Sequence, residues 1–283
     1  MTTHLIIQSA AEVATADLKQ LAKVSGAKAI EALNAQAFRL LAADPARKLA
    51  VAAHCERARL DFGFVPQQRK PTDFGLAVMD MDSTLISIEC IDEIADMADL
   101  KPQVAAITAA AMRGEIDFQQ SLRQRVALLK GLPESALERV YQERLSLSPG
   151  AEILLAGLRA AGIKLLLVSG GFRFFTDRLK ARLGLDFAFS NCLEIVDGKL
   201  TGKIAGEIID AAGKAALLIK IRDELGLTCE QVIGIGDGAN DVKMLAASAV
   251  SIAYHAKPVV QSETGYALNF TGLDGVLPLL SGS

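Results

Sequence analysis

The sequence Leu76-Ala-Val-Met-Asp80-Met-Asp82-Ser-Thr-Leu-Ile86 joins a short apolar run to two carboxylates that are two residues apart. The apolar run predicts a buried strand, and side chains at i and i+2 of a strand share one side. Asp80 and Asp82 should therefore point the same way beyond the carboxyl end of this strand. Two such carboxylates repel each other unless a positive charge holds them, and Mg²⁺ is a cation that prefers oxygen ligands. The alternative interpretation is a strand that ends in an ordinary Asp-rich turn.

A second apolar run, 163–168, ends in a hydroxyl residue and two glycines, Ser169-Gly170-Gly171. The serine hydroxyl and the free main-chain amides of such a turn, placed before a helix, can bind an anion. Lys214 lies early in the helical run 211–225 and offers a fixed positive charge for a phosphate group. Each feature is common by itself, so the prediction depends on their order along the chain.

A third apolar run, 231–235, precedes Gly236-Asp237-Gly-Ala-Asn240-Asp241. Asp237 follows the strand directly, and Asn240 and Asp241 begin the next helix. Together with the first two runs, this places an acid or a hydroxyl group at the end of three strands. The set supplies what phosphoryl chemistry needs, namely a nucleophile, an anion-binding turn and a metal site.

From residue 76 onward, apolar strands alternate with helices, which is typical of a doubly wound parallel sheet, a Rossmann-like α/β fold. Residues 89–146 interrupt this pattern because they read as helix throughout. This run is too long for a minimal crossover, so we expect a helical cap, at about 87–148, inserted after the first strand and covering the site. Strands are expected near 76–81, 163–168, 187–190, 231–235 and 249–252, and the Asp197-Gly198 turn predicts a small hairpin over 194–201.

A chain of 283 residues favours one large domain and a smaller one. Residues 1–70 read as a small α+β domain without catalytic signals, and residues 74–283 as the domain that carries the chemistry. Val65–Thr72, with two prolines and two charges, reads as the linker. No ligand motif is visible in the N-terminal domain, so a role in homodimer formation or in packing is expected at least as much as a regulatory one.

These motifs resemble those of the haloacid-dehalogenase-like superfamily of hydrolases, and most closely those of the phosphoserine phosphatases. The matching segments are Asp80-Met-Asp82-Ser-Thr, Ser169-Gly170, Lys214 and Gly236-Asp237-Gly238-Ala239-Asn240-Asp241. The resemblance extends from about Ala77 to the C-terminus. The strings 117–131 and 253–258 narrow it to the phosphoserine branch.

The resemblance implies hydrolysis of O-phospho-L-serine to L-serine and phosphate, the last step of serine biosynthesis. Asp80 would attack phosphorus and form an aspartyl-phosphate. Asp82 would protonate the leaving alkoxide and then activate the water that hydrolyses the intermediate. Mg²⁺ would bind Asp80, the main-chain carbonyl of Asp82 and Asp237, and would bridge to a phosphoryl oxygen.

The same resemblance assigns the phosphate contacts. Ser169 and the Gly170 amide would hold the other phosphoryl oxygens, and Lys214 would neutralise their charge. Asn240 would lie beside the phosphate. Asp241 would orient Lys214 or a metal-bound water from outside the contacts to the substrate. The alternative for Asp241 is an acid at a helix start that interacts only with the helix dipole.

Specificity is expected from the cap. By resemblance, Glu89 would bind the substrate ammonium and Arg125 its carboxylate, since a planar guanidinium pairs with a carboxylate through two hydrogen bonds. Phe118 and Met112 would form the apolar wall. On the sequence alone, a helix N-terminal acid at Glu89 and a surface ion pair at Arg125 are the simpler alternatives. His255 has no partner at ligand spacing and is expected to be structural or to lie at the rim.

The composition excludes several classes of partner. A net charge of −3, with the basic residues scattered among acids, gives no electrostatic footprint for nucleic acid or for an anionic membrane. No apolar run approaches the length of a membrane span, and no leader is visible. The four cysteines, Cys55, Cys90, Cys192 and Cys229, have no CxxC spacing and read as buried, reduced residues. We therefore expect a cytoplasmic protein with a small-molecule substrate.

Two other functions compete with the first. The aspartyl-phosphate could pass to an acceptor alcohol, or the substrate could be a different small phosphate ester. A signalling receiver domain, whose Asp is phosphorylated and merely reports, belongs to another class. The acid/base residue Asp82 and the helical cap argue against a receiver, which needs neither.

Overall fold

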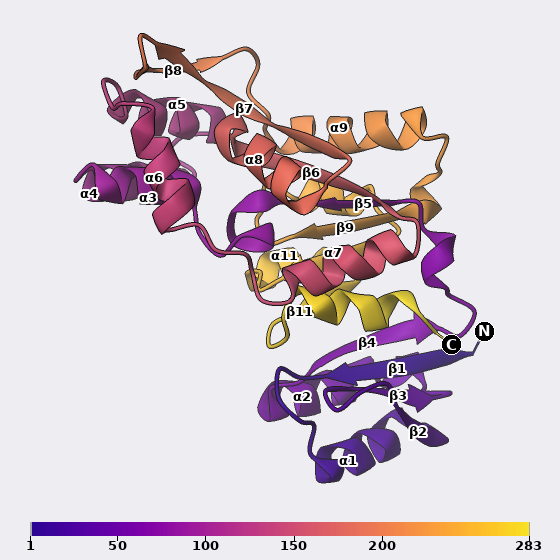
Figure 1. Ribbon diagram of the computed structural model, residues 1–283. Helices are drawn as coiled ribbons and strands as arrows, with labels where there is room; N and C mark the ends of the chain where they lie inside the picture. Colours follow the sequence, from indigo (N-terminus) through magenta and orange to yellow (C-terminus); the bar gives the residue numbers. More distant parts are fainter. Residues whose placement is uncertain (1, 283) are drawn as a thin grey trace.

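The computed structural model describes residues 2–282, which form one twisted sheet of eleven strands with helices around it (Figure 1). The strand order is β2-β3-β1-β4-β11-β10-β9-β5-β6-β7-β8. The strands are β1 (Thr3–Gln8), β2 (Ala29–Ala32), β3 (Ala37–Leu41), β4 (Asp61–Pro66), β5 (Leu76–Met79), β6 (Lys164–Phe172), β7 (Phe187–Val196), β8 (Lys199–Ala205), β9 (Val232–Gly236), β10 (Val250–Tyr254) and β11 (Tyr266–Leu268). Met1 and Ser283, the outermost residues of the two expected domains, lie outside the described residues.

The local sequence marks the start of some of the helices. They are α1 (Thr15–Ser25), α2 (Lys48–Ala58), α3 (Cys90–Met97), α4 (Lys101–Met112), α5 (Phe118–Leu128), α6 (Ser135–Glu143), α7 (Ala151–Ala160), α8 (Arg173–Leu183), α9 (Ala211–Glu224), α10 (Val242–Ala246) and α11 (Pro258–Ser262), followed by a 3-10 helix over Leu273–Leu280. Asp117 caps α5 and Asp210 caps α9 by accepting main-chain amides of the first turn. Within residues 2–282, no helix combines the length and the apolar character needed to cross a membrane.

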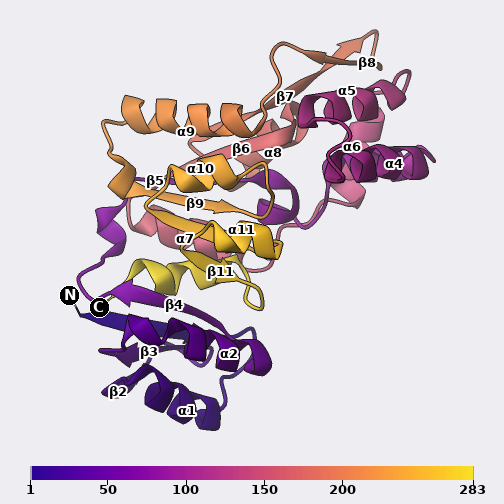
Figure 2. The same ribbon diagram turned by 180° about the vertical axis from the view of Figure 1, so that it is seen from behind.

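The larger part of the sheet is parallel and is covered on both faces. Strands β5, β6, β9, β10 and β11 run parallel, and β7 pairs parallel with β6. Along β5, Leu76 and Val78 pack against α9, whereas Ala77 and Met79 face the core formed with α7 and α8. The helices therefore lie on both faces of the sheet (Figures 1 and 2), and the predicted doubly wound, Rossmann-like fold is confirmed.

The strand order reverses at β5. The chain leaves β5 for its neighbour β6 on one side and later returns to β9 on the other. Open α/β sheets bind ligands at such a reversal, outside the carboxyl ends of the strands. Asp80 follows the carboxyl end of β5, so the topology places it at this point.

The predicted helical cap consists of α3 to α6 and stands beyond the carboxyl ends of the parallel strands (Figure 1). Two connections join it to the sheet and lie side by side, because Ile86 pairs with Leu147 and the Ser148 amide donates to the Leu85 carbonyl (3.0 Å). The β7–β8 hairpin also contacts the cap. It turns at Asp197-Gly198 with positive φ at both residues, as a type I′ turn requires, and is longer than the predicted 194–201.

The N-terminal unit, residues 3–66, has the order β1-α1-β2-β3-α2-β4 and an antiparallel ferredoxin-like topology. Helices α1 and α2 cover one face and share a separate core with the sheet that includes Leu5, Ile7, Leu21 and Val51. The predicted small α+β unit is therefore present. It lies at the end of the molecule opposite the cap (Figure 2).

Three features differ from the sequence predictions. Val65, expected in a linker, is fully buried in β4, which ends only at Pro66, so the linker is shorter than predicted. Strand β11 was not predicted, and its Ala267 pairs antiparallel with Phe62 of β4. The N-terminal strands and the parallel strands therefore form one mixed sheet. The sequence did not predict this junction, because a strand of three residues is too short to show a periodic pattern. Cys229, expected to be buried, is exposed.

Candidate active site

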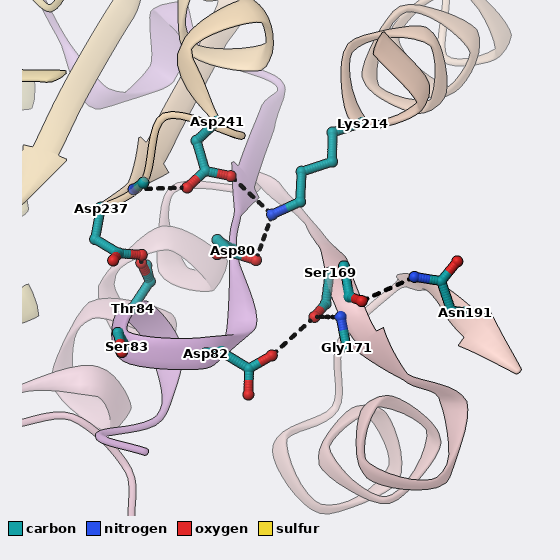
Figure 3. Close-up of polar contacts among 12 residues, drawn as sticks. Asp80, Asp82, Ser83, Thr84, Ser169, Gly171, Asn191, Lys214, Asp237 and Asp241 are labelled. Carbon is teal, nitrogen blue, oxygen red and sulfur yellow. Dashed lines mark hydrogen bonds and ion pairs between the residues drawn. The ribbon is translucent and has the colours of Figure 1, made fainter. Parts of the chain in front are cut away.

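Asp80 and Asp82 lie in the tight turn that follows β5 (Figure 3). Both residues have extended backbone angles, and Met81 between them is fully buried, so the two carboxylates line the same cavity. Ser83 adopts a φ of 56°, in the left-handed region, which turns the chain sharply toward the cap. The two acids therefore share one direction, although the strand itself ends before them.

Lys214 reaches from α9 into the site with its side chain buried. Its Nζ donates to Asp80 Oδ1 (2.6 Å) and to Asp241 Oδ1 (2.7 Å) (Figure 3). Burial alone would lower the pKa of Lys214, but the two carboxylates outweigh it and raise the pKa. The other oxygen of Asp241 accepts the Gly238 amide (3.0 Å). Asp241 is thus placed to orient Lys214, and the helix dipole need not be its main partner.

The carboxylates at this edge of the sheet form a cluster. Oxygens of Asp80, Asp237 and Asp241 lie within 4.8 Å of one another. Asp237 Oδ1 also accepts the Thr84 hydroxyl (2.9 Å), a contact that the sequence did not predict although Thr84 lies in the first motif. Asp82 adds a fourth carboxylate to this part of the site, and Lys214 contacts two of the four, Asp80 and Asp241. This excess of negative charge and the all-oxygen donor set fit a divalent metal ion.

The pKa shifts of the cluster have the same cause. Burial, reinforced by repulsion from Asp241, raises the pKa of Asp237 to about 6. Burial and the same neighbour also raise the pKa of Asp80 well above its usual range, although Lys214 opposes this. Lys214 compensates the charge of these two carboxylates only in part, and a cation bound between them would lower both pKa values.

Asp82 is held by two hydrogen bonds. Its Oδ1 accepts the Cys90 amide (2.8 Å), and its Oδ2 accepts the Ser169 hydroxyl (3.2 Å). Burial raises the pKa of Asp82, with the Cys90 contact opposing it. A carboxyl group with a raised pKa can carry a proton nearer to neutral pH, which suits a general acid. Burial also raises the pKa of the Cys90 thiol, so this cysteine is not a reactive thiolate.

Ser169, Gly170 and Gly171, predicted as a turn after a strand that ends at 168, instead form the irregular last part of β6, where the pairing with β7 shifts register, and lie against these groups. The Gly171 amide donates to Ser169 Oγ (2.8 Å), and a Cβ at Gly171 would lie 2.6 Å from Asp82 Oδ2, so no side chain fits there. Asn191 of β7 donates to the Gly170 carbonyl (2.8 Å) and fixes this segment. The sequence did not predict a role for Asn191, because one polar residue within a strand gives no distinct signal.

An inner cavity of about 140 Å³ separates these groups from the cap, whose wall carries Glu89, Phe118 and Arg125. Glu89 Oε1 accepts the Ser83 hydroxyl (2.7 Å). Desolvation beneath the cap, and then repulsion from Asp82, raise the pKa of Glu89 to about 7. Among residues 2–282, Arg125 Nε is buried without a hydrogen-bond partner. The cap wall of the cavity therefore offers a carboxylate and a guanidinium whose Nε has no hydrogen-bond partner.

The remaining predicted residues lie toward the solvent. Asn240 lines both the inner cavity and an outer channel of about 940 Å³. Met112, the last residue of α4, lines only the outer channel and is 67% exposed, so it does not close the inner wall as predicted. His255 also lines this channel, as the predicted rim residue, and its Nε2 donates to the Thr271 carbonyl (3.1 Å).

Comparisons with known proteins agree with this geometry. A family model described as haloacid dehalogenase-like hydrolase matches residues 74–248, and one described as a domain of unknown function (DUF4072) matches residues 5–57. A phosphoserine phosphatase from Polaromonas sp. is 52% identical over 216 residues, which make up 75% of this chain and 92% of that protein.

Two solved structures are similar as well. The crystal structure of a HAD family hydrolase from Salmonella enterica subsp. enterica serovar Typhi has a TM-score of 0.89 and 34% identity, and 99% of each chain is covered. This likeness includes the N-terminal unit. The structure of a substrate-bound phosphoserine phosphatase complex has a TM-score of 0.69 and 38% identity, and covers 74% of this chain and 99% of the other.

Proposed function

Since the chain belongs to the haloacid dehalogenase-like hydrolase family, we propose that it hydrolyses O-phospho-L-serine to L-serine and phosphate through an aspartyl-phosphate on Asp80. One observation carries the proposal: the inner cavity is lined by buried Asp80, which Lys214 contacts, and by the cap residue Arg125, whose Nε has no hydrogen-bond partner among the described residues. Phosphoserine presents a phosphate at one end and a carboxylate and an ammonium at the other. The proposal can be tested by measuring phosphate release from phosphoserine and from a panel of other small phosphate esters. A preference for an ester without an amino-acid group would contradict the proposal.

The chemistry at phosphorus requires positioning and charge neutralisation, because the phosphoryl oxygens repel an incoming nucleophile. Asp80 would attack phosphorus, and Lys214, which already contacts it, would neutralise the oxygens. Ser169 and the Gly170 amide would hold them. Asp82 would give its proton to the serine oxygen and then take one from water. Mg²⁺, bound by Asp80, the main-chain carbonyl of Asp82 and Asp237, would supply the remaining positive charge.

Recognition of the serine part would come from the cap. Arg125 would pair with the carboxylate of the substrate, which supplies the partner that its Nε lacks. Glu89 would bind the ammonium, since its carboxylate lies on the same wall. Phe118 closes the cavity near Gly170, with its ring 3.0 Å from the position of a Cβ there. Asn240 would lie beside the phosphate.

Binding of Mg²⁺ should stabilise the folded chain. A ligand that binds only the folded state at about 100 times its Kd stabilises it by about 2.7 kcal/mol, or roughly 5 °C in melting temperature. We expect Mg²⁺ to raise the melting temperature of the metal-free protein in a thermal melt. Asp237→Asn should remove most of this response, because it removes one carboxylate ligand.

Asp237→Asn also tests whether the raised pKa of Asp237 affects the stability of the fold. The folded-state pKa of Asp237 is raised to about 6, above the value of about 4 in the unfolded chain. The protonated form therefore favours folding, and its contribution to stability is lost as the pH rises from about 4 through 6. Without metal, Asp237→Asn should melt at a higher temperature than the parent at pH 7, with a smaller difference at pH 4. An unchanged Mg²⁺ response would place the metal elsewhere.

Arg125→Ala tests the carboxylate contact. A hydrogen bond to a charged group contributes about 1.5–3 kcal/mol, so kcat/KM for phosphoserine should fall roughly 10- to 150-fold. Hydrolysis of p-nitrophenyl phosphate should barely change, because that ester has neither a carboxylate nor an ammonium. Steady-state kinetics with both substrates measure the difference.

Arg123 provides a matched control on the same helix, since it is exposed and contacts only Gln119 among the hydrogen-bond partners of the described residues. Arg123→Ala should leave both substrates unaffected. Parallel losses for both substrates in Arg125→Ala would mean that Arg125 holds the cap or the phosphate. The specificity assignment would then fail, and the phosphatase assignment would stand.

We also propose that residues 1–70 and 74–283 are separate functional units that share one sheet. The two family models match within these ranges, at 5–57 and 74–248. The N-terminal unit contributes no residue to the inner cavity among the described residues. Its role is therefore expected to be indirect, through its contacts with the phosphatase unit.

A further inference from the structure

Asp61 of the N-terminal unit lies at the catalytic edge of the sheet. It is the first residue of β4, which runs antiparallel to β11, and Phe62 pairs with Ala267. An antiparallel strand begins at the edge where its neighbour ends. Asp61 therefore lies beside the carboxyl end of β11, on the same edge as Asp80 and Asp237.

The carboxylate of Asp61 is almost fully buried, at 2% exposure, and accepts four hydrogen bonds. Its Oδ1 accepts the Asn269 amide (2.7 Å), and its Oδ2 accepts the Phe270 amide (3.0 Å), the Thr271 amide (2.8 Å) and the Thr271 hydroxyl (2.8 Å). The ion pairs found within residues 2–282 do not include Asp61. One residue of the N-terminal unit thus fixes three consecutive residues of the phosphatase unit.

The segment held by Asp61 shapes the rim of the outer channel. The Thr271 carbonyl accepts His255 Nε2 (3.1 Å), and the Leu268 carbonyl accepts the His255 amide (2.7 Å). His255 has a φ of 46°, in the left-handed region, which is unfavourable for a residue with a side chain. The contacts from residues 268–271 therefore help to keep His255 in place at the rim.

The same segment also contacts the second connection of the cap. The Leu273 amide donates to the Pro149 carbonyl (2.7 Å), next to Ser148, whose amide donates to the Leu85 carbonyl of the first connection. A Cβ at Gly272 would lie only 2.6 Å from the Pro149 carbonyl oxygen, so the two segments are in close contact. A shift of residues 269–273 would therefore be transmitted to the base of the cap.

We propose that Asp61 is a positioning residue: it holds residues 269–273 in the conformation that fixes both the channel rim and the base of the cap. The N-terminal unit would in this way set how readily the cap closes over a substrate. The kinetic part of this inference rests on the proposed function, because it uses phosphoserine as the substrate. The structural part does not.

Two variants of the full chain test it. Asp61→Asn keeps the size of the side chain but leaves an NH₂ group facing at least one donor, and Thr271→Val removes only the hydroxyl donor. The KM for phosphoserine should rise roughly 3- to 10-fold in Asp61→Asn, the equivalent of one hydrogen bond, and less in Thr271→Val. The kcat should stay within about twofold, since no group at phosphorus contacts Asp61. Hydrogen–deuterium exchange should become faster at 146–150 and 253–256.

Arg69→Met is the matched control. Arg69 joins the same two units through the Tyr266 hydroxyl (2.7 Å) and the Leu279 carbonyl (3.1 Å), without contacting residues 269–273. The Arg69→Met variant should have a lower melting temperature, but its KM for phosphoserine and its hydrogen–deuterium exchange at 146–150 should be unchanged. If Asp61→Asn behaves like Arg69→Met, Asp61 only docks the unit and the proposal is overturned. If the parent protein fails to hydrolyse phosphoserine, the proposed function fails, while the exchange measurement still decides the role of Asp61.

Discussion

Replacing Asp80 with Asn should abolish hydrolysis of phosphoserine while the chain stays folded. The amide has the same size but is not nucleophilic, and loss of an enzyme nucleophile has cost on the order of 10⁶-fold in kcat. The fold should tolerate the change, because burial and Asp241 already raise the pKa of Asp80 and disfavour its charge. The amide oxygen of the variant side chain can still accept the Lys214 ammonium, which donates to Asp80 in the parent.

Phosphate release should be measured together with mass spectrometry of acid-quenched protein, which detects a covalent phosphoryl group. The parent should show the aspartyl-phosphate and Asp80→Asn should not. Asp223→Asn is the matched control, since Asp223 is an exposed acid of α9 that pairs with Arg222. Turnover by Asp80→Asn above the level that deamidation explains would show that water or another group attacks phosphorus directly.

Much of the fold could be predicted because its signals are local. Leu76 and Val78 face one side of β5 and Ala77 and Met79 the other, which a short apolar run buried on both faces must do. The junction of β4 and β11 was missed for the opposite reason. Phe62 and Ala267 are far apart in the sequence, and the short β11 has no pattern that would predict their pairing.

The site shows the same division between local and distant signals. The positions of Asp80, Asp237 and Ser169 could be predicted because each follows an apolar run of sequence, and the doubly wound fold brings the carboxyl ends of the corresponding strands together. The hydrogen bonds of Thr84 and Asn191 were missed, since each joins elements distant in sequence. The position of Met112 depends on how α4 lies over the channel, which the sequence does not define.

Asp82→Asn should slow both halves of the reaction, for a reason visible in its surroundings. Its half-buried carboxyl is held between the Cys90 amide and the Ser169 hydroxyl, and desolvation raises its pKa. It can therefore hold the proton that the leaving serine oxygen needs, whereas an amide cannot donate it. General acid–base catalysis contributes typically about 10²–10⁴-fold, so the turnover of phosphoserine should fall by that factor.

The leaving group separates the two roles of Asp82. p-Nitrophenolate departs without a proton, so the first turnover of p-nitrophenyl phosphate by Asp82→Asn should be nearly as fast as in the parent. Hydrolysis of the aspartyl-phosphate still needs a base to activate water, so a burst of p-nitrophenol should precede slow turnover. Stopped-flow absorbance measures this burst, which Asp80→Asn should lack. If the first turnover of phosphoserine and that of p-nitrophenyl phosphate slow by the same factor, protonation of the leaving group does not explain the loss. Asp82 would then act by holding Ser169 and Gly171 in place.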